Sequence, residues 1–401
     1  MTTNEWELVR IRDIGKVVTG RTPPTVVTSY FGEEYPFITP SDMIGDKYIS
    51  NPERGLSTEG AALLKNNCLP PKSIAVSCIG WQMGKVVMIS RPSFTNQQIN
   101  TIIPNDHVEP DFIYYSLCTR REELKTLGSV GTRTPILIKS SFENFQVLLP
   151  PLPTQRKIAS VLSAYDDLIE NNTRRMAILE EMAQSLYREW FVHFRFPGRE
   201  KKRLVESELG LIPEGWEVRT FGEVAINFDS KRKPLSSLQR AKMKGEYPYY
   251  GAAKIFDYID AYIFDGKYLL IAEDGSVISD RGKPVLQMAI GKFWSNNHTH
   301  VIQGKQPIST DFLYLFMSDF DISGYITGAA QPKITQANLN RIPIIVPHMS
   351  LLEKFDEIVG YLLSYSANLK AKNANLRQTR DLLLPKLISG EVDVEGLNIH
   401  I

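Results

Sequence analysis

The stretch "LIPEGWEVRTFGEV" (211–224) looks like a chain start, although it stands near the middle of a 401-residue sequence. A turn with Pro and Gly and then a Trp precede a short amphipathic run. The first residues of the chain, "NEWELVRIRDIGKV" (4–17), have nearly the same pattern. Trp6 corresponds to Trp216, and Ile14-Gly15 to Phe221-Gly222. The pattern predicts two copies of one domain.

The ends of the two copies also match. "GTRTPILIKSSFENFQVLLPPLP" begins at Gly131, and "GAAQPKITQANLNRIPIIVPHMS" begins at Gly328. Both have a Gly turn, a Pro, a short helical stretch and an alternating apolar strand. At one constant spacing, three residues of the first copy match three of the second: Phe142, Phe145 and Pro150 with Leu339, Ile342 and Pro347. Upstream, each copy has an Asn-rich turn between strands, at 96–98 and 296–298. The period is too long for a solenoid, so we interpret it as a domain duplication.

Each copy is followed by a helix with apolar residues at alternating steps of four and three. This spacing is typical of a coiled-coil seam. The predicted helix-pairing residues are Ile158, Leu162, Tyr165, Ile169, Met176, Leu179 and Leu186 in the first helix, and Phe355, Val359, Leu362, Leu369, Leu376 and Leu383 in the second. Asn172 and Asn373 interrupt the stripes as register-setting residues. The alternative is that each helix packs only on its own domain.

The pattern predicts an α+β fold with two globular α/β domains, a pair of long helices and a pseudo-twofold internal repeat. The expected boundaries are a first domain at 1–151, a first helix at 152–196, a linker at 197–215, a second domain at 216–347, and a second helix with the C-terminal tail at 348–401. Charge does not decide between parallel and antiparallel helices. Antiparallel pairing brings Asp166 near Arg380 but also Arg175 near Lys370.

A seam over 158–190 is about 50 Å long at ~1.5 Å per residue. Two domains on such a spacer suit duplex DNA, which offers equivalent groove positions about 34 Å apart. Because the two copies differ strongly in sequence, the two half-sites should differ as well.

The overall composition excludes several classes of protein. The net charge is +1, so a nucleic-acid footprint must be local. The three cysteines lack metal-type spacing and indicate reduced thiols. The N-terminus has no apolar signal segment, and no apolar run approaches the ~20 residues that span a bilayer. We expect a soluble cytoplasmic protein without a membrane partner.

Candidate DNA-binding residues lie in polar and basic loops. From Lys231 to Lys244 the second copy has six basic residues and no acid, which suits phosphate binding. Gln, Asn and Arg on loops suit base edges in the major groove. The candidates are Arg21, Thr22, Gln97, Gln98 and Arg133 in the first copy, and Lys231, Arg232, Lys233, Lys242, Asn297, His298, Gln331 and Lys333 in the second.

Motifs for chemistry are lacking. There is no P-loop and no Asn/Asp-Pro-Pro-aromatic stretch of the kind that adenine methyltransferases carry. His298 and His300 have no nearby sequence cluster of acids or cysteines, so we expect no metal site. We interpret the paired acids at 166–167 and 180–181 as solvent-exposed residues of the helices rather than as catalytic pairs. We expect no catalytic residues in this chain.

The chain resembles the specificity subunit of Type I restriction–modification systems. The stretches that carry the resemblance are "LPPLPTQRKIASVLSAYDDLIENN", "LYREWFVHF", "ELGLIPEGWEVRTFGEVA", "YPYYGA", "GKFWSNNHTHVI", "GAAQPKIT" and "LLLPKLISGEVDV". They extend over essentially the whole chain.

The resemblance implies more than the pattern shows. It implies that the helices are antiparallel and act as a ruler, and that each domain is a target recognition domain for one half of an asymmetric bipartite site in double-stranded DNA. It also implies two modification (methyltransferase) subunits on the helices, which methylate adenine at N6, and ATP-dependent restriction subunits that translocate and cleave DNA. S-adenosylmethionine, ATP and Mg would be used by these partners, with no cofactor in this chain. Two alternatives remain: a coiled-coil scaffold that binds only proteins, and the detached specificity part of a single-chain restriction–methylation enzyme.

Overall fold

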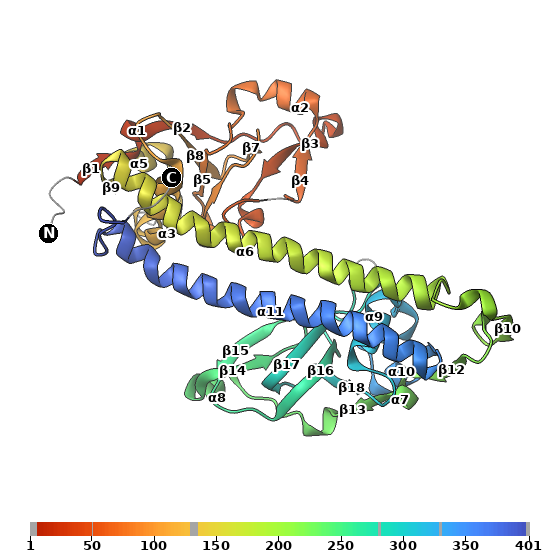
Figure 1. Ribbon diagram of the computed structural model, residues 1–401. Coiled ribbons are helices and arrows are strands. Elements are labelled where there is room, and N and C mark those ends of the chain that lie inside the picture. Colours follow the sequence, from red (N-terminus) through yellow and green to blue (C-terminus); the bar gives the residue numbers. More distant parts are fainter. Residues whose placement is uncertain (1–5, 50, 129–134, 280–281, 329–330, 398–401) are drawn as a thin grey trace. The chain divides into compact units, whose positions relative to one another are not determined.

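The computed structural model describes residues 6–49, 51–128, 135–279, 282–328 and 331–397. The chain divides into two compact units. The first contains residues 1–172 and 372–401, and the second contains residues 173–371. Two long helices, α6 (Leu152–Tyr187) and α11 (Met349–Ile388), contribute to both units (Figure 1). None of the helices in the described ranges has the length and apolar character needed to cross a membrane.

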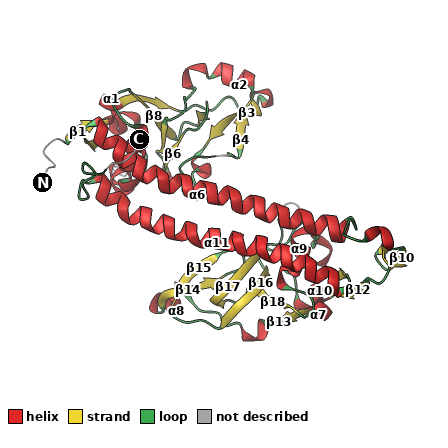
Figure 2. Ribbon diagram, in the orientation of Figure 1, coloured by secondary structure: helices red, strands yellow, loops and turns green. Residues whose placement is uncertain are grey.

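The first unit holds three small sheets (Figure 2). Their strand orders are β2-β8-β5-β6, β4-β3-β7 and β1-β9. The strands are β1 (Glu7–Arg10), β2 (Gly15–Thr19), β3 (Phe31–Ile38), β4 (Arg54–Leu56), β5 (Ile74–Ser77), β6 (Val86–Met88), β7 (Phe94–Thr95), β8 (Ile99–Pro104) and β9 (Gln146–Leu149). The α-helices are α1 (Ile11–Ile14), α2 (Thr58–Leu63), α3 (Pro110–Thr119), α4 (Arg121–Gly128) and α5 (Lys139–Glu143), and short 3-10 helices are η2 (Thr28–Tyr30), η3 (Pro40–Asp42), η4 (Lys65–Asn67) and η5 (Gly80–Gln82).

The second unit holds one six-stranded sheet and two strand pairs. The sheet has the order β13-β18-β16-β17-β14-β15, and the pairs are β12-β19 and β10-β11. The strands are β10 (Leu204–Ser207), β11 (Gly210–Pro213), β12 (Glu217–Thr220), β13 (Ala225–Asn227), β14 (Lys244–Tyr250), β15 (Ile255–Ile259), β16 (Phe264–Ala272), β17 (Leu286–Ser295), β18 (Thr299–Gly304) and β19 (Pro343–Val346). The helices are α7 (Phe221–Val224), α8 (Ser237–Lys242), α9 (Thr310–Asp319) and α10 (Gln336–Asn340), with the π-helix η6 (Arg188–Val192) and the 3-10 helices η7 (Arg199–Lys201), η8 (Asp229–Lys231) and η9 (Ser323–Tyr325).

The predicted duplication is confirmed by the strand topology. The order β2-β8-β5-β6 in the first unit repeats as β13-β18-β16-β17 in the second. The antiparallel pair β1-β9 repeats as β12-β19, and the parallel contact of β3 with β7 repeats as β14 with β17. The long strand β17 therefore takes the places of both β6 and β7.

One detail of the predicted alignment is wrong. The backbone N–H of Ile11 donates to the carbonyl of Phe145 at 3.0 Å, and that of Phe221 donates to Ile342 at 2.7 Å. Phe221 therefore corresponds to Ile11 rather than to Ile14. Ile14-Gly15 and Phe221-Gly222 are alike in residue type but do not occupy equivalent positions. The spacing that relates Trp6 to Trp216 also relates the starts of the two helices, with no gap between them.

The helix starts support this corrected register. The carboxylate of Asp13 accepts from the N–H of Arg10 at 3.3 Å, and the carboxylate of Glu223 accepts from the N–H of Thr220 at 2.7 Å. An acid three residues into a helix thus satisfies an otherwise unpaired donor in both copies.

The apolar stripes of the long helices are inward-facing in both units. Every predicted helix-pairing residue is buried or half-buried, and most of their neighbours on the helices are exposed. In the first unit, Ile158 and Leu162 of α6 join Leu387 of α11 in the core of the domain. In the second unit, Phe355 and Val359 of α11 join the core. The stripe ends therefore pack on the domains as well as on the partner helix, and the alternative that each helix packs only on its own domain is wrong.

The two helices are antiparallel within each unit. In the first, Asp166 pairs with Arg380, and the amide of Asn373 donates to the carbonyl of Ile169 at 3.0 Å. The amide of Asn172 also donates to the side-chain oxygen of Asn373 at 2.8 Å, as expected for register-setting residues. Rising numbers on α6 thus meet falling numbers on α11.

The same direction holds in the second unit. The hydroxyl of Ser366 donates to Glu180 at 3.0 Å, and the ring of Trp190 lies 5.9 Å from that of Phe355. The antiparallel arrangement that charge alone left undecided is therefore present in both units.

The segment predicted as a linker, 197–215, contains the antiparallel pair β10-β11. Ile212 within it is buried in the core of the second unit. Trp216, which follows, lies 5.0 Å from Phe196, ring to ring. This segment is packed against the second unit rather than extended as a spacer.

Candidate nucleic-acid interface

In the first domain, two of the predicted loops meet at one edge. The N–H of Arg21 donates to the carbonyl of Thr95 at 2.9 Å, and the hydroxyl of Thr22 donates to the side-chain oxygen of Gln97 at 2.7 Å. A Cβ on Gly20 would lie 2.1 Å from the carbonyl oxygen of Asn96, so only glycine allows this approach. The loop after β2 and the turn before β8 therefore form one surface.

The side chains on this edge remain available to a ligand in different degrees. Arg21 and Gln97 are exposed, and Thr22 and Gln98 are half-buried. The side chains of Arg21 and Gln97 provide donors and an acceptor of the kind that read base edges. Arg133 lies outside the described residues.

The polar turn at this edge has the same geometry in both domains. The side-chain oxygen of Asn96 accepts from the N–H of Gln98 at 3.1 Å, and that of Asn296 accepts from His298 at 3.0 Å. An Asn that bonds to the backbone two residues on stabilises a tight turn. The repeated Asn thus presents Gln97 in one domain and Asn297 in the other at equivalent places.

The second domain brings three predicted segments together. Arg232 donates to the carbonyl of Thr299 at 2.8 Å and to that of Asn297 at 3.3 Å, which joins the basic loop to the turn. Lys333 from the third segment pairs at 3.0 Å with Glu273, which also pairs with Arg232 at 2.6 Å. The basic loop, the turn and the segment before α10 therefore form one edge.

Arg232 requires a correction. Its side chain is only 13% exposed, and its guanidinium is occupied by Glu273 and Asp229. A buried, paired guanidinium does not reach a phosphate, so the structure gives Arg232 a supporting role in the loop. Its neighbours Lys231 and Lys233 are exposed and remain candidates.

The rest of the basic stretch is partly neutralised. Arg240 lies 3.6 Å from Asp257 and Lys244 lies 2.5 Å from it, so an acid from β15 offsets charges that looked unopposed in the sequence. Lys242 is exposed at the end of α8. Leu235, just before α8, packs in a small cluster with Trp294, two residues before the turn, so α8 adjoins the same edge.

The remaining candidates of the second domain are at the surface. Asn297 and Gln331 are exposed, and the side chain of Lys333 is 45% exposed. His298 is also exposed, and its Nδ1 lies 2.7 Å from a carboxylate oxygen of Asp274.

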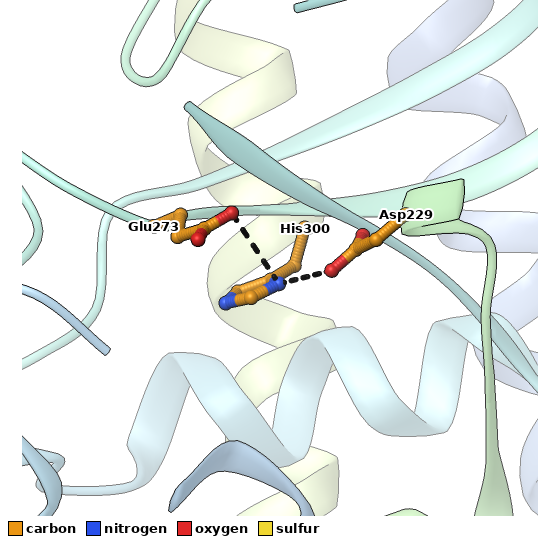
Figure 3. A group of neighbouring side chains, drawn as sticks. All are labelled: Asp229, Glu273 and His300. Atoms are coloured by element: carbon orange, nitrogen blue, oxygen red, sulfur yellow. Dashed lines mark hydrogen bonds and ion pairs between the residues drawn. The ribbon is translucent and has the colours of Figure 1, made fainter. Parts of the chain in front are cut away.

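A charged cluster lies beneath the edge of the second domain (Figure 3). The Nδ1 of His300 lies 2.5 Å from Asp229 and 3.9 Å from Glu273, and its Nε2 lies 2.9 Å from the carbonyl oxygen of Ile334. His300 is 1% exposed. His298 lies in the turn before β18 and His300 lies on β18 itself, so the first imidazole is at the surface and the second is inside.

Asp229, Glu273 and His300 have the composition of a metal site, but their partners are already in place. Both ring nitrogens of His300 already lie at hydrogen-bond distance from protein oxygens, Nδ1 from Asp229 and Nε2 from the carbonyl of Ile334. Arg232 and Lys333 balance the carboxylates. The cluster is therefore explained as a buried ion-pair network.

The acids of this network are held in their charged form. Burial opposes ionisation of Asp229, but the hydrogen bond and charge of His300, together with hydrogen bonds from Val301 and Asn227, outweigh burial and lower its pKa. Burial also opposes ionisation of Glu273, and hydrogen bonds from Arg232 and Lys333 outweigh it and lower its pKa.

The equivalent place in the first domain holds a neutral network. The N–H of Cys78 donates to the carbonyl of Gln98, as that of Glu273 does to His298, so Cys78 and Glu273 correspond. The amide of Asn100 donates to the sulfur of Cys78 at 3.2 Å and accepts from the hydroxyl of Thr19 at 2.7 Å. Burial raises the pKa of the Cys78 thiol to about 12, so this network carries no charge.

Sequence reasoning did not find these supporting residues. Glu273 lies 41 residues from Arg232 in sequence, whereas Asp229 lies only three residues before it. The one local signal was Asp229, which stands three residues before Arg232 at the start of the basic stretch.

The fold contains two copies of one domain, each with a polar edge, and each is joined to antiparallel helices. The chain belongs to the family described as Type I restriction modification DNA specificity domain, which it matches over residues 3–181 and 213–378.

Relatives and solved structures agree with this family. The chain is 29% identical to the Type I restriction enzyme MjaIX specificity subunit of Methanocaldococcus jannaschii over 98% of this chain and 95% of that protein. It is 37% identical to a putative type I restriction enzyme specificity subunit of Haemophilus influenzae, over 38% of this chain and 40% of that protein. The crystal structure of a Type I restriction-modification S subunit from M. genitalium has the same fold, with a TM-score of 0.61 and 16% identity over 95% of this chain and 96% of that one.

Proposed function

We propose that this chain is the DNA sequence-specificity subunit of a Type I restriction–modification complex. Each recognition domain reads one half of an asymmetric bipartite site in double-stranded DNA. The observation that carries the proposal is the repeated edge, built by the same turn in both domains but presenting different side chains. Arg21 and Gln97 are exposed at one edge, and Lys231 and Asn297 at the other.

The role of the helices as a ruler is supported by the way each domain is fixed to them. In the first unit, the hydroxyl of Tyr115 in α3 donates to Asp166 of α6 at 2.5 Å, and Arg380 of α11 pairs with the same carboxylate. In the second unit, Ser309 donates to Asp356 of α11 at 2.6 Å. Buried polar contacts of this kind fix the orientation of a domain on its helices, and a fixed spacing requires such rigidity.

The helices also carry exposed apolar side chains that suit docking of partner subunits. Leu168, Met182 and Tyr361 are 52%, 52% and 69% exposed. Leu168 belongs to the first unit, and Met182 and Tyr361 belong to the second, so each unit offers apolar helix side chains of its own. We assign these helix faces, one in each unit, to two modification subunits, which would supply S-adenosylmethionine. Restriction subunits that use ATP and Mg would complete the complex in the cytoplasm, and this chain would remain non-catalytic.

Salt-dependent binding to DNA tests the proposal against the scaffold alternative. The complex assembled with its modification subunits should bind a duplex of its target sequence with an affinity that falls steeply with salt, because phosphate contacts release counterions. A protein-binding scaffold predicts no sequence-dependent affinity. Equal affinity for target and scrambled duplexes would reject the proposal.

Shortening the helices tests the ruler. Deleting seven residues from α6 together with the seven facing residues of α11 keeps the heptad pattern and removes about 10 Å of helix. The spacer of the recognised site should change in length, or the complex should fail to assemble. An assembled complex with an unchanged spacer would contradict the ruler.

A further inference from the structure

Trp81 stands exposed at the recognition edge of the first domain. It lies in η5 between β5 and β6, and it is 78% exposed. The preceding Gly80 has a φ of +61°, a conformation that favours glycine and turns the chain outward. Gly80 donates to the carbonyl of Pro135 at 3.0 Å, and Cys78 donates to that of Gln98 at 2.8 Å. The Trp81 loop therefore adjoins the polar turn.

The folding of the domain does not explain this exposure. An indole placed in water gives up the stabilisation that burial of a large aromatic ring supplies. Three other tryptophans, Trp190, Trp216 and Trp294, are at most 9% exposed. The position of Trp81 is also held, because Arg121 donates to the carbonyl of Trp81 at 3.3 Å and to that of Met83 at 3.2 Å.

Positive charge surrounds the ring. The ammonium of Lys85 lies 5.4 Å from the centroid of the indole. Neither Lys85 nor Arg121 forms an ion pair with an acid in the described part of the chain. Burial and the nearby charge of Arg121 lower the pKa of Lys85, as expected where two cations lie together without a counterion. An exposed aromatic face beside unpaired cations suits bases next to phosphates.

We propose that Trp81 is a specificity-determining residue for the first DNA half-site. Its indole makes apolar contact with base edges, while Lys85 faces the adjoining phosphate and Arg121 holds the loop in place. The inference rests on the proposed DNA-binding function and adds the contact residue.

The second domain should lack this aromatic contact. Ile79 bridges to Ile136 and Asp274 bridges to Lys333, so the two loops correspond. Gly275 has a φ of +76°, like Gly80, and the next residue is Ser276 in place of Trp81. Ser276 thus provides a matched control in the same chain.

The first test is the affinity of the assembled complex for three duplexes: the target, one with the first half-site scrambled, and one with the second scrambled. Trp81→Ala should weaken binding to the target about tenfold, since an aromatic contact to a base contributes on that scale. The loss should persist when the second half-site is scrambled and vanish when the first is scrambled. Ser276→Ala should bind like wild type.

Quenching of tryptophan fluorescence by acrylamide gives an independent readout. In the free complex, Trp81→Phe should remove a quencher-accessible part of the emission. In wild type, the target duplex should protect that part. Suppose that the wild type discriminates target from scrambled DNA. The inference is then overturned if Trp81→Ala binds with unchanged affinity and DNA does not protect the accessible emission. A wild type that fails to discriminate would instead reject the proposed function, and this inference with it.

Discussion

The two recognition domains place opposite kinds of chemistry beneath the same turn. The first domain has a neutral network there, and the second has a charged one. The corresponding positions are Thr19, Asn100 and Cys78 in the first domain, and Asp229, His300 and Glu273 in the second. The backbone contacts around them are shared.

The difference teaches how one scaffold can carry two edges. In the second domain, the buried acids hold Arg232, which in turn holds the basic loop against the turn. In the first domain, Thr22 and Gln97 join the loop to the turn directly. Charge thus orients the basic edge, and neutral hydrogen bonds orient the other.

The largest expected effect comes from breaking the charged network. Asp229→Ala leaves His300 and Arg232 buried without one carboxylate, which should cost about 3–5 kcal/mol of unfolding free energy. Urea denaturation of the full chain measures this cost. Asp265→Ala, at an exposed position on β16, should change the free energy by less than about 0.5 kcal/mol. Equal stability of the two variants would show that the network does not support the domain.

A smaller effect is expected on DNA binding from the exposed lysines. Lys231→Ala with Lys233→Ala should lower the slope of log affinity against log salt by nearly 2 in magnitude, because each phosphate contact contributes about 0.9. Stability should not change. Lys244→Ala is the matched control, since Lys244 is already paired with Asp257. A double variant with the slope of this control would remove the loop from the interface.

The neutral network should be less sensitive. Thr19→Val removes the hydroxyl that donates to Asn100 and keeps the shape of the side chain, so we expect a loss of about 1–2 kcal/mol in urea denaturation. A loss as large as that of Asp229→Ala would remove the contrast between the domains.

The smallest expected effect is the change in stability of the wild type as pH varies near neutrality. The pKa values of Asp229 and Glu273 are lowered in the folded chain, so their contribution is fully present above their ordinary values of about 4. It is lost as pH falls through the lowered values. The variant with Asp229→Asn and Glu273→Gln should be less stable at neutral pH and lose less stability in acid. A decline parallel to that of wild type would contradict the assignment.

The sequence predicts the duplication well, because Trp6 and Trp216 directly precede matching strands and the apolar stripes have a strict period. The predicted alignment pairs Phe221 with Ile14, three residues after its true counterpart Ile11. The similarity of two apolar-Gly pairs suggested that alignment, although the spacing between Trp6 and Trp216 contradicts it. The sequence also predicts that polar loops form the edges. It does not separate Arg232 from Lys231 and Lys233, because the closer of the two acids that pair with Arg232 is Glu273, 41 residues away in sequence.

Exposure is equally hard to infer from local pattern. Trp81 has the composition of a core residue, and only the turn at Gly80 and its neighbours place it in solvent. Likewise, the helix directions follow from contacts such as Asp166 with Arg380, which the charge pattern alone could not choose.

The most direct test of the central claim is a single-molecule methylome of cells with and without this gene. The account predicts an asymmetric bipartite N6-methyladenine motif that disappears when the gene is deleted. An unchanged methylome, in cells whose partner methyltransferase is active, would contradict the account and favour a protein-binding scaffold.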